Sequence, residues 1–232
     1  MRLSPRSFAL GALVIFLCAL PTLAMAQSPS GHRDAQISAE QADLESAERT
    51  YTAAEQTRKQ GNNAAAQKSY AIAFKELTPL AKEGNAQAEV LLGTMYLMGY
   101  SAPVDPDRAD KLFTAAAQQG NADAQFFLGA RSVLHHQNVA NGMKWLELSA
   151  GQGNQDAQLL LGRTYLQGIQ GAVARDPIQA DKWLRLAAKD NLPFYKLQLE
   201  GAERQMSAAD VAKGQTLAAA WKPRTSPAPP KN

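Results

Sequence analysis

The sequence has one cysteine and three histidines among its 232 residues, so the usual ligands of metals and partners in disulfides are scarce. The cysteine, Cys18, lies inside an N-terminal apolar run that we expect to be removed after export. The remaining chain then holds no thiol. It can enter an oxidising compartment without disulfide formation, and it must be stabilised by packing alone.

Short enzyme signatures are also missing. The chain has no Ser-x-x-Lys, Gly-x-Ser-x-Gly, His-Glu-x-x-His or Gly-x-x-x-x-Gly-Lys motif, the patterns of acyl transfer, metalloproteolysis and phosphate binding. The adjacent His135 and His136 could ligate a metal with a distant carboxylate, but neighbouring side chains point apart and no spaced third ligand follows. We interpret both as exposed loop residues and expect no enzyme, metal or cofactor.

No strong excess of one charge sign is present. The chain has 24 basic and 21 acidic residues, and 22 basic residues remain without Arg2 and Arg6. The basic residues are scattered and form no stripe with interleaved aromatics, which a nucleic-acid surface would need. We therefore expect no nucleic-acid partner despite a calculated pI near 9.0.

The first 26 residues have the pattern of a secretion signal. Arg2 and Arg6 precede the apolar run 8–20, and Ala24-Met25-Ala26 is a small-x-small cleavage site. The run is shorter than the roughly 20 residues that span a bilayer. We expect cleavage after Ala26, a periplasmic or secreted protein, and no membrane span afterwards; an uncleaved anchor is the alternative.

A short segment recurs three times at spacings of 36 and 33 residues. Its copies are Gly84-Asn85-Ala86-Gln87-Ala88, Gly120-Asn121-Ala122-Asp123-Ala124 and Gly153-Asn154-Gln155-Asp156-Ala157. A period of this length predicts a solenoid of helical hairpins. Such a fold exposes a long ridged surface and is typical of binding proteins.

The residues of one repeat predict two helices. Glycine can end a helix in the left-handed conformation and the following asparagine can cap the next one. The first helix is expected at 86–97, with Gly93 where a neighbouring backbone comes close. Gly129 and Gly162 hold the same place in the later copies. Asp105-Pro106 and Asp176-Pro177 predict the start of the second helix, as an N-cap followed by proline.

The order of these motifs resembles the Sel1-like repeat, a relative of the tetratricopeptide repeat. The resemblance rests on Gly-Asn-x-x-Ala, Leu-Gly-x-x-Tyr-Leu-x-Gly, Asp-Pro, Ala-x-x-Trp and Ala-Ala, and it covers residues 84–190. It implies an all-α fold, an α-solenoid of antiparallel helical hairpins, and an adaptor that holds other proteins, often in a bacterial envelope. No catalytic residue follows from the motif.

Repeats and flanking composition together predict the domain organisation. After the signal peptide (1–26) and a flexible leader (27–39), a degenerate hairpin at 40–83 caps the solenoid. Three repeats follow at 84–119, 120–152 and 153–190, the second being divergent. Capping helices at 191–222 and a proline-rich disordered tail at 223–232 complete the chain.

Candidate binding residues come from an apolar pair before each Leu-Gly: Val90-Leu91, Phe126-Phe127 and Leu159-Leu160. At about 100° per residue, both members cannot face one core. Leu91, Phe127 and Leu160 are therefore candidates for an apolar strip that receives a protein or peptide partner, with Arg131 and Arg163 tuning specificity. Tighter packing between repeats is the alternative interpretation.

Two further alternatives concern ligands. Trp145 and Trp183 could stack on a sugar or peptide, but they occupy a repeat position also filled by Leu112, which favours core packing. Some cysteine-rich relatives of the family have been discussed as binders or hydrolases of cell-wall compounds. A cell-wall-related hydrolase or peptidoglycan-fragment binder is thus the alternative to a non-catalytic scaffold in the envelope.

Overall fold

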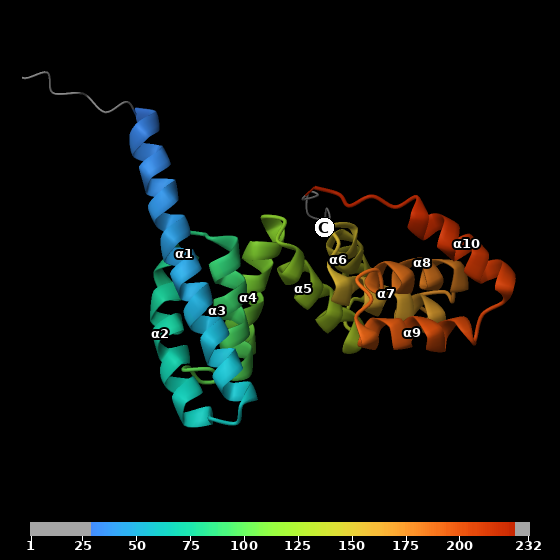
Figure 1. Ribbon diagram of the computed structural model, residues 1–232, viewed down its shortest axis with the longest axis horizontal. Coiled ribbons are helices and arrows are strands. Elements are labelled where there is room, and N and C mark those ends of the chain that lie inside the picture. Colours follow the sequence, from blue (N-terminus) through green and yellow to red (C-terminus); the bar gives the residue numbers. More distant parts are fainter. Residues whose placement is uncertain (1–28, 226–232) are drawn as a thin grey trace, which may run out of the picture. The chain divides into compact units, whose positions relative to one another are not determined.

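A computed structural model describes residues 29–225 of the chain. The chain divides into two units, residues 1–38 and 39–232, and of the first only the start of one helix is described. Every regular element within 29–225 is a helix, which confirms the all-α prediction (Figure 1). The helices are α1 (Pro29–Lys59), α2 (Asn63–Lys82), α3 (Ala86–Met98), α4 (Pro106–Gln118), α5 (Ala122–Leu134), α6 (Val139–Gly151), α7 (Gln155–Gln167), α8 (Pro177–Ala187), α9 (Pro193–Glu203) and α10 (Ala208–Ala219).

The N-terminal hairpin consists of α1 and α2. Helix α1 begins at Pro29, within residues 27–39, which the sequence predicts to be a flexible leader. The structure differs because proline is tolerated in the first turn of a helix, where its missing N–H leaves no bond unmade. The predicted signal peptide and cleavage site lie outside the described residues, as do residues 226–232 of the predicted tail.

The three repeats form the hairpins α3–α4, α5–α6 and α7–α8. Gly84, Gly120 and Gly153 end the preceding helices with φ values of +86°, +90° and +101°, in the region that favours glycine. The asparagine after each glycine caps the next helix, as in Asn121, whose side-chain oxygen accepts the N–H of Ala124. The Gly-Asn prediction is confirmed in all three copies.

The second helix of a repeat starts in two different ways. Asp105 and Asp176 cap α4 and α8 and are followed by proline, as the sequence predicts. Helix α6 instead follows Asn138, which has a φ of +49° and accepts the N–H of Asn141. The divergent second repeat therefore reaches its second helix through a different connection.

The two helices of each hairpin approach closely at the predicted glycines. A Cβ atom placed on Gly162 would lie 2.5 Å from Leu184 Cγ and 3.0 Å from the Leu184 backbone nitrogen. On Gly129 it would lie 2.9 Å from the carbonyl oxygen of Gly142. Only glycine fits these positions without a shift of the facing helix, because packed interiors leave no spare volume.

Polar side chains at the end of the second helix link it to the first helix of the same repeat. Gln119 donates to Glu89 at 2.9 Å, and Gln152 donates to Gln125 at 2.8 Å. In the third repeat the buried Gln158 donates to the carbonyl oxygen of Ala150, but its own Oε1 has no partner among the described residues. In the third repeat, Asp190 occupies the position of Gln119 and Gln152. A carboxylate cannot donate the hydrogen bond that the glutamines provide.

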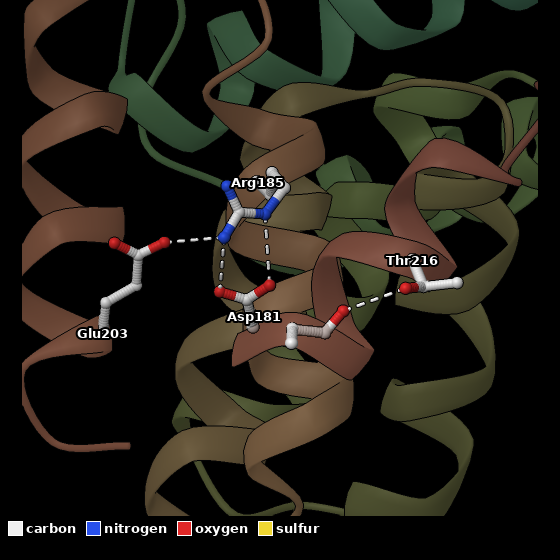
Figure 2. A network of polar contacts seen from close by, with 5 residues as sticks. Asp181, Arg185, Glu203 and Thr216 are labelled. Carbon is white, nitrogen blue, oxygen red and sulfur yellow. Dashed lines mark hydrogen bonds and ion pairs between the residues drawn. The ribbon is translucent and has the colours of Figure 1, made fainter. Parts of the chain in front are cut away.

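The predicted C-terminal capping helices are α9 and α10. They pack on α8, where Gly214 allows α10 to approach Asp181. Figure 2 shows that Arg185 binds Asp181 through two nitrogens and reaches Glu203 of α9 at 2.7 Å. Burial raises the pKa of Asp181, although the Arg185 guanidinium opposes that shift. This network ties α8 to the end of α9.

Candidate functional site

The apolar pairs before each Leu-Gly join the hairpins on either side. Val90 and Phe126, the first members of two pairs, belong to the hydrophobic clusters of α3–α6 and α5–α8. The second members belong to the cluster of the preceding hairpins. Leu91 packs with residues of α1–α3, and Phe127 stacks on Phe113 of α4 at a ring distance of 4.7 Å. The two residues of a pair therefore point toward different hairpins, which is why they do not share one face of the helix.

Leu160 follows the same rule. It packs with residues of α5, α6 and α8, while its neighbour Leu159 joins α8 and α9. Leu91, Phe127 and Leu160 are half-buried and lie in three different clusters. All three residues therefore pack between hairpins, which is the alternative interpretation of the apolar pairs, and partner binding by their exposed parts stays a prediction.

Phe127 and Arg131 line one cavity of about 380 Å³ between α4 and α5, which we call the Phe127 cavity. Its apolar walls include Leu97, Phe113 and Leu128. Arg131 forms an ion pair with Asp110 of α4 across the cavity wall. The cavity can therefore accept an apolar side chain next to a polar edge, where His135 is exposed.

Leu160 and Arg163 line a second cavity of about 390 Å³, the Leu160 cavity, between the end of α5 and α7. Leu134 and His136 reach it from α5 and the following turn. Arg163 is exposed, and none of the ion pairs found within residues 29–225 includes it. It is a free positive charge beside an apolar depression.

The C-terminal half of α5 contributes to both cavities. Phe127 and Arg131 line the first, and Leu134, which is 63% exposed, lines the second. Leu91 lines neither. Sequence reasoning missed Leu134, because its exposure depends on the divergent turn after α5 rather than on the repeat pattern.

The tryptophans of the second and third repeats are core residues. Trp145 is 8% exposed and Trp183 is 7% exposed, as expected from the repeat position that they share with Leu112.

Tyr165 donates a 3.0 Å hydrogen bond to Glu147, and burial raises the pKa of this tyrosine.

Little in the two cavities points to acid–base chemistry. Asp110 in the Phe127 cavity is engaged by Arg131, and His135 and His136 are exposed at the turn after α5. In the described part of the chain, no three His, Cys, Asp or Glu residues gather as metal ligands would. Both cavities are suited to contact and shape complementarity.

The hairpins, turns and glycine contacts define an α-solenoid protein of the repeat type. The Sel1 repeat family matches residues 86–121, 122–154 and 155–192. The chain therefore contains three Sel1 repeats, and the resemblance noted in the sequence is confirmed over these residues. The matched boundaries begin two residues after the predicted ones because the family's unit starts at the first helix.

Two of the solved structures that resemble this chain show the extent of the likeness. One is c5321, described as a protective antigen present in uropathogenic Escherichia coli strains with an SLR fold: 27% identity, TM-score 0.55, covering 65% of this chain and 33% of that one. The other is a Sel1 repeat protein from Oxalobacter formigenes: 29% identity, TM-score 0.48, covering 55% and 96%. The match thus spans one third of the E. coli antigen. No curated protein matches the chain.

Among residues 29–225, no helix combines the length and the apolar character that crossing a bilayer requires.

Proposed function

We propose that this protein is an exported, non-catalytic scaffold that holds a protein partner in the cell envelope. The observation that carries the proposal is the pair of cavities on either side of α5, within an array of Sel1 repeats. Repeat solenoids bind partners along surfaces built from successive units. Proteins with Sel1 repeats generally serve as interaction scaffolds. Export rests on the sequence pattern of residues 1–26.

The partner would insert apolar side chains from one segment into both cavities. The cavities, of about 380 and 390 Å³, can each admit an apolar side chain, and the exposed Leu134 adds an apolar contact at the second. Buried anchor side chains supply most of the energy of such contacts, while charges at the rim select the partner. Arg163 selects for an acidic residue next to the anchor.

A site-specific crosslink tests the proposal. A photoreactive amino acid at Leu134 should capture a distinct envelope protein, because this residue is exposed beside the Leu160 cavity. The same probe at Ile72, which is 54% exposed on α2, is the matched control and should not capture it. The crosslinked product is identified by mass spectrometry.

Charge variants complete the test. Leu134→Glu and Arg163→Glu should remove capture while leaving the melting temperature unchanged, because both side chains are exposed. Ile72→Glu should retain capture. Phe127→Glu should lose both capture and stability, because a carboxylate would be pressed against Phe113 without a partner. Full capture by Leu134→Glu and Arg163→Glu would remove this surface as the binding site.

A further inference from the structure

A third cavity, which we call the Lys182 cavity, lies where the chain returns after α10 to the second and third repeats. It has a volume of about 380 Å³ and lies between α6, α7, α8 and residues 221–224. Three cations line it: Lys182, Lys222 and Arg224. The indoles of Trp183 and Trp221 also contribute to its wall. Neither the repeat pattern nor the proposed scaffold surface accounts for this gathering of charge.

The segment after α10 contacts α6 at Gly151, a repeat position where the other units carry a side chain. The backbone N–H of Arg224 donates to the carbonyl oxygen of Gly151 at 2.8 Å. A Cβ atom on Gly151 would lie 3.6 Å from Arg224 Cδ, so a longer side chain would displace the arginine. The equivalent residues of the other units are long: Lys82, Gln118 and Lys189. The cavity is therefore specific to this repeat.

The three cations of the cavity outnumber its carboxylates. Glu147 is the carboxylate of the wall, and it accepts the hydroxyl of Tyr165 at 3.0 Å. None of the ion pairs within residues 29–225 includes Lys182, Lys222 or Arg224. Three cations that converge around a single carboxylate repel one another, and a bound anion relieves that repulsion.

Lys182 shows the effect of this surrounding. Its Nζ lies 4.0 Å from the centre of the Trp183 ring, and the side chain is half-buried. Burial lowers the pKa of Lys182, the charge of Arg224 lowers it further, and Glu147 opposes the shift. The equivalent lysines of the first two repeats, Lys111 and Lys144, are exposed. The C-terminal segment thus turns an ordinary surface lysine into part of a cavity.

We propose that the Lys182 cavity binds acidic side chains of a partner polypeptide, so that the C-terminal segment completes a second contact site. This inference rests on the proposed scaffold function and names the chemistry of the segment that is held. The cations come from α8 and from the segment after α10, and indoles lie between them in the wall. Such a wall suits carboxylates carried by neighbouring residues with apolar stems better than one compact ion.

The first test is a titration of the whole protein with a capped tetraglutamate peptide at low salt, followed by tryptophan fluorescence and calorimetry. A capped tetraglutamine peptide is the matched control. Binding should perturb the indoles of the wall and weaken as salt rises, because the attraction is between charges. The double substitution Lys182→Gln and Arg224→Gln should reduce affinity by about tenfold or more. Lys111→Gln and Lys144→Gln, at equivalent repeat positions, should leave it unchanged.

A second variant tests the geometry without removing a charge. Gly151→Gln should displace Arg224 and weaken tetraglutamate binding while melting stays close to wild type. Equal losses in the Lys144→Gln control, or inorganic phosphate that binds as tightly and displaces the peptide, would overturn the proposal. If the double variant and Gly151→Gln lose peptide binding but the crosslink from Leu134 of α5 is retained, a separate second site is supported. No peptide binding by the wild type, with that crosslink present, refutes this inference and leaves the scaffold proposal standing.

Discussion

Replacing Gly162 by alanine should loosen the third hairpin although alanine is the better helix former. The new Cβ would lie 2.5 Å from Leu184 Cγ, 2.9 Å from its Cδ2 and 3.0 Å from its backbone nitrogen. The leucine is 1% exposed, so it is enclosed by neighbouring residues and cannot turn away without moving them. Relief therefore requires that α7 and α8 move apart.

Two opposing terms set the magnitude. Glycine to alanine inside a helix gains about 1 kcal/mol from propensity. Overpacking of a tight interface costs about 1–3 kcal/mol, and the upper end applies where the contact includes backbone. The net loss in the free energy of unfolding should be about 1–2 kcal/mol, or roughly 3–6 °C in melting temperature for a chain of this length.

The assay is thermal and urea unfolding followed by circular dichroism. The matched control is Gly201→Ala in α9, where a Cβ would meet nothing within 4 Å. It should raise the free energy of unfolding by about 0.5–1 kcal/mol, because only the propensity term remains. Gly93→Ala, which meets the edge of the Phe113 ring at 3.0 Å, should fall between the two. A Gly162→Ala protein at least as stable as wild type would refute the close approach of α7 and α8.

Three more outcomes follow from single positions. Burial raises the pKa of Glu89, so the folded state binds a proton that the unfolded state has already released; stability should fall as pH rises from the ordinary glutamate pKa through the raised one. Glu89→Gln, which matches Gln125 and Gln158 of the later repeats, should stabilise the protein at neutral pH. The free energy of unfolding in urea titrations should then depend less on pH. A variant less stable than wild type at pH 7 contradicts this prediction. Asp176→Ala removes the cap of two α8 N–H groups and should cost about 1 kcal/mol of unfolding free energy, with Asp107→Ala, a first-turn residue of α4 that caps nothing, as control. Arg131→Met should leave Asp110 without its ion pair. The free energy of unfolding should change by less than about 1 kcal/mol, since both side chains are over a third exposed and such pairs are weak. A larger loss in thermal unfolding would show that this pair holds α4 to α5.

Part of the candidate surface could be read from the sequence. The apolar pairs mark positions that cannot all face one helix interface, and Phe127 and Leu160 do line cavities. The continuous strip did not follow, because Leu91, Phe127 and Leu160 each pack into the cluster of the preceding hairpins. Helical periodicity gives the direction of a side chain on its own helix, but which neighbouring helix covers that direction depends on how the hairpins stack.

The sequence by itself determined the hairpins. Gly84 and Asn85 end one helix and begin the next, and Asp176 with Pro177 starts another, because these choices depend on backbone conformation and capping within a few residues. The tertiary structure alone decided the Lys182 cavity, since Gly151, Lys182 and Arg224 are far apart in the chain and meet only after α10 packs on α8. Local rules fix where a helix starts and stops. Which distant charges meet is settled by the packing of complete helices, and no short segment of the sequence contains that information.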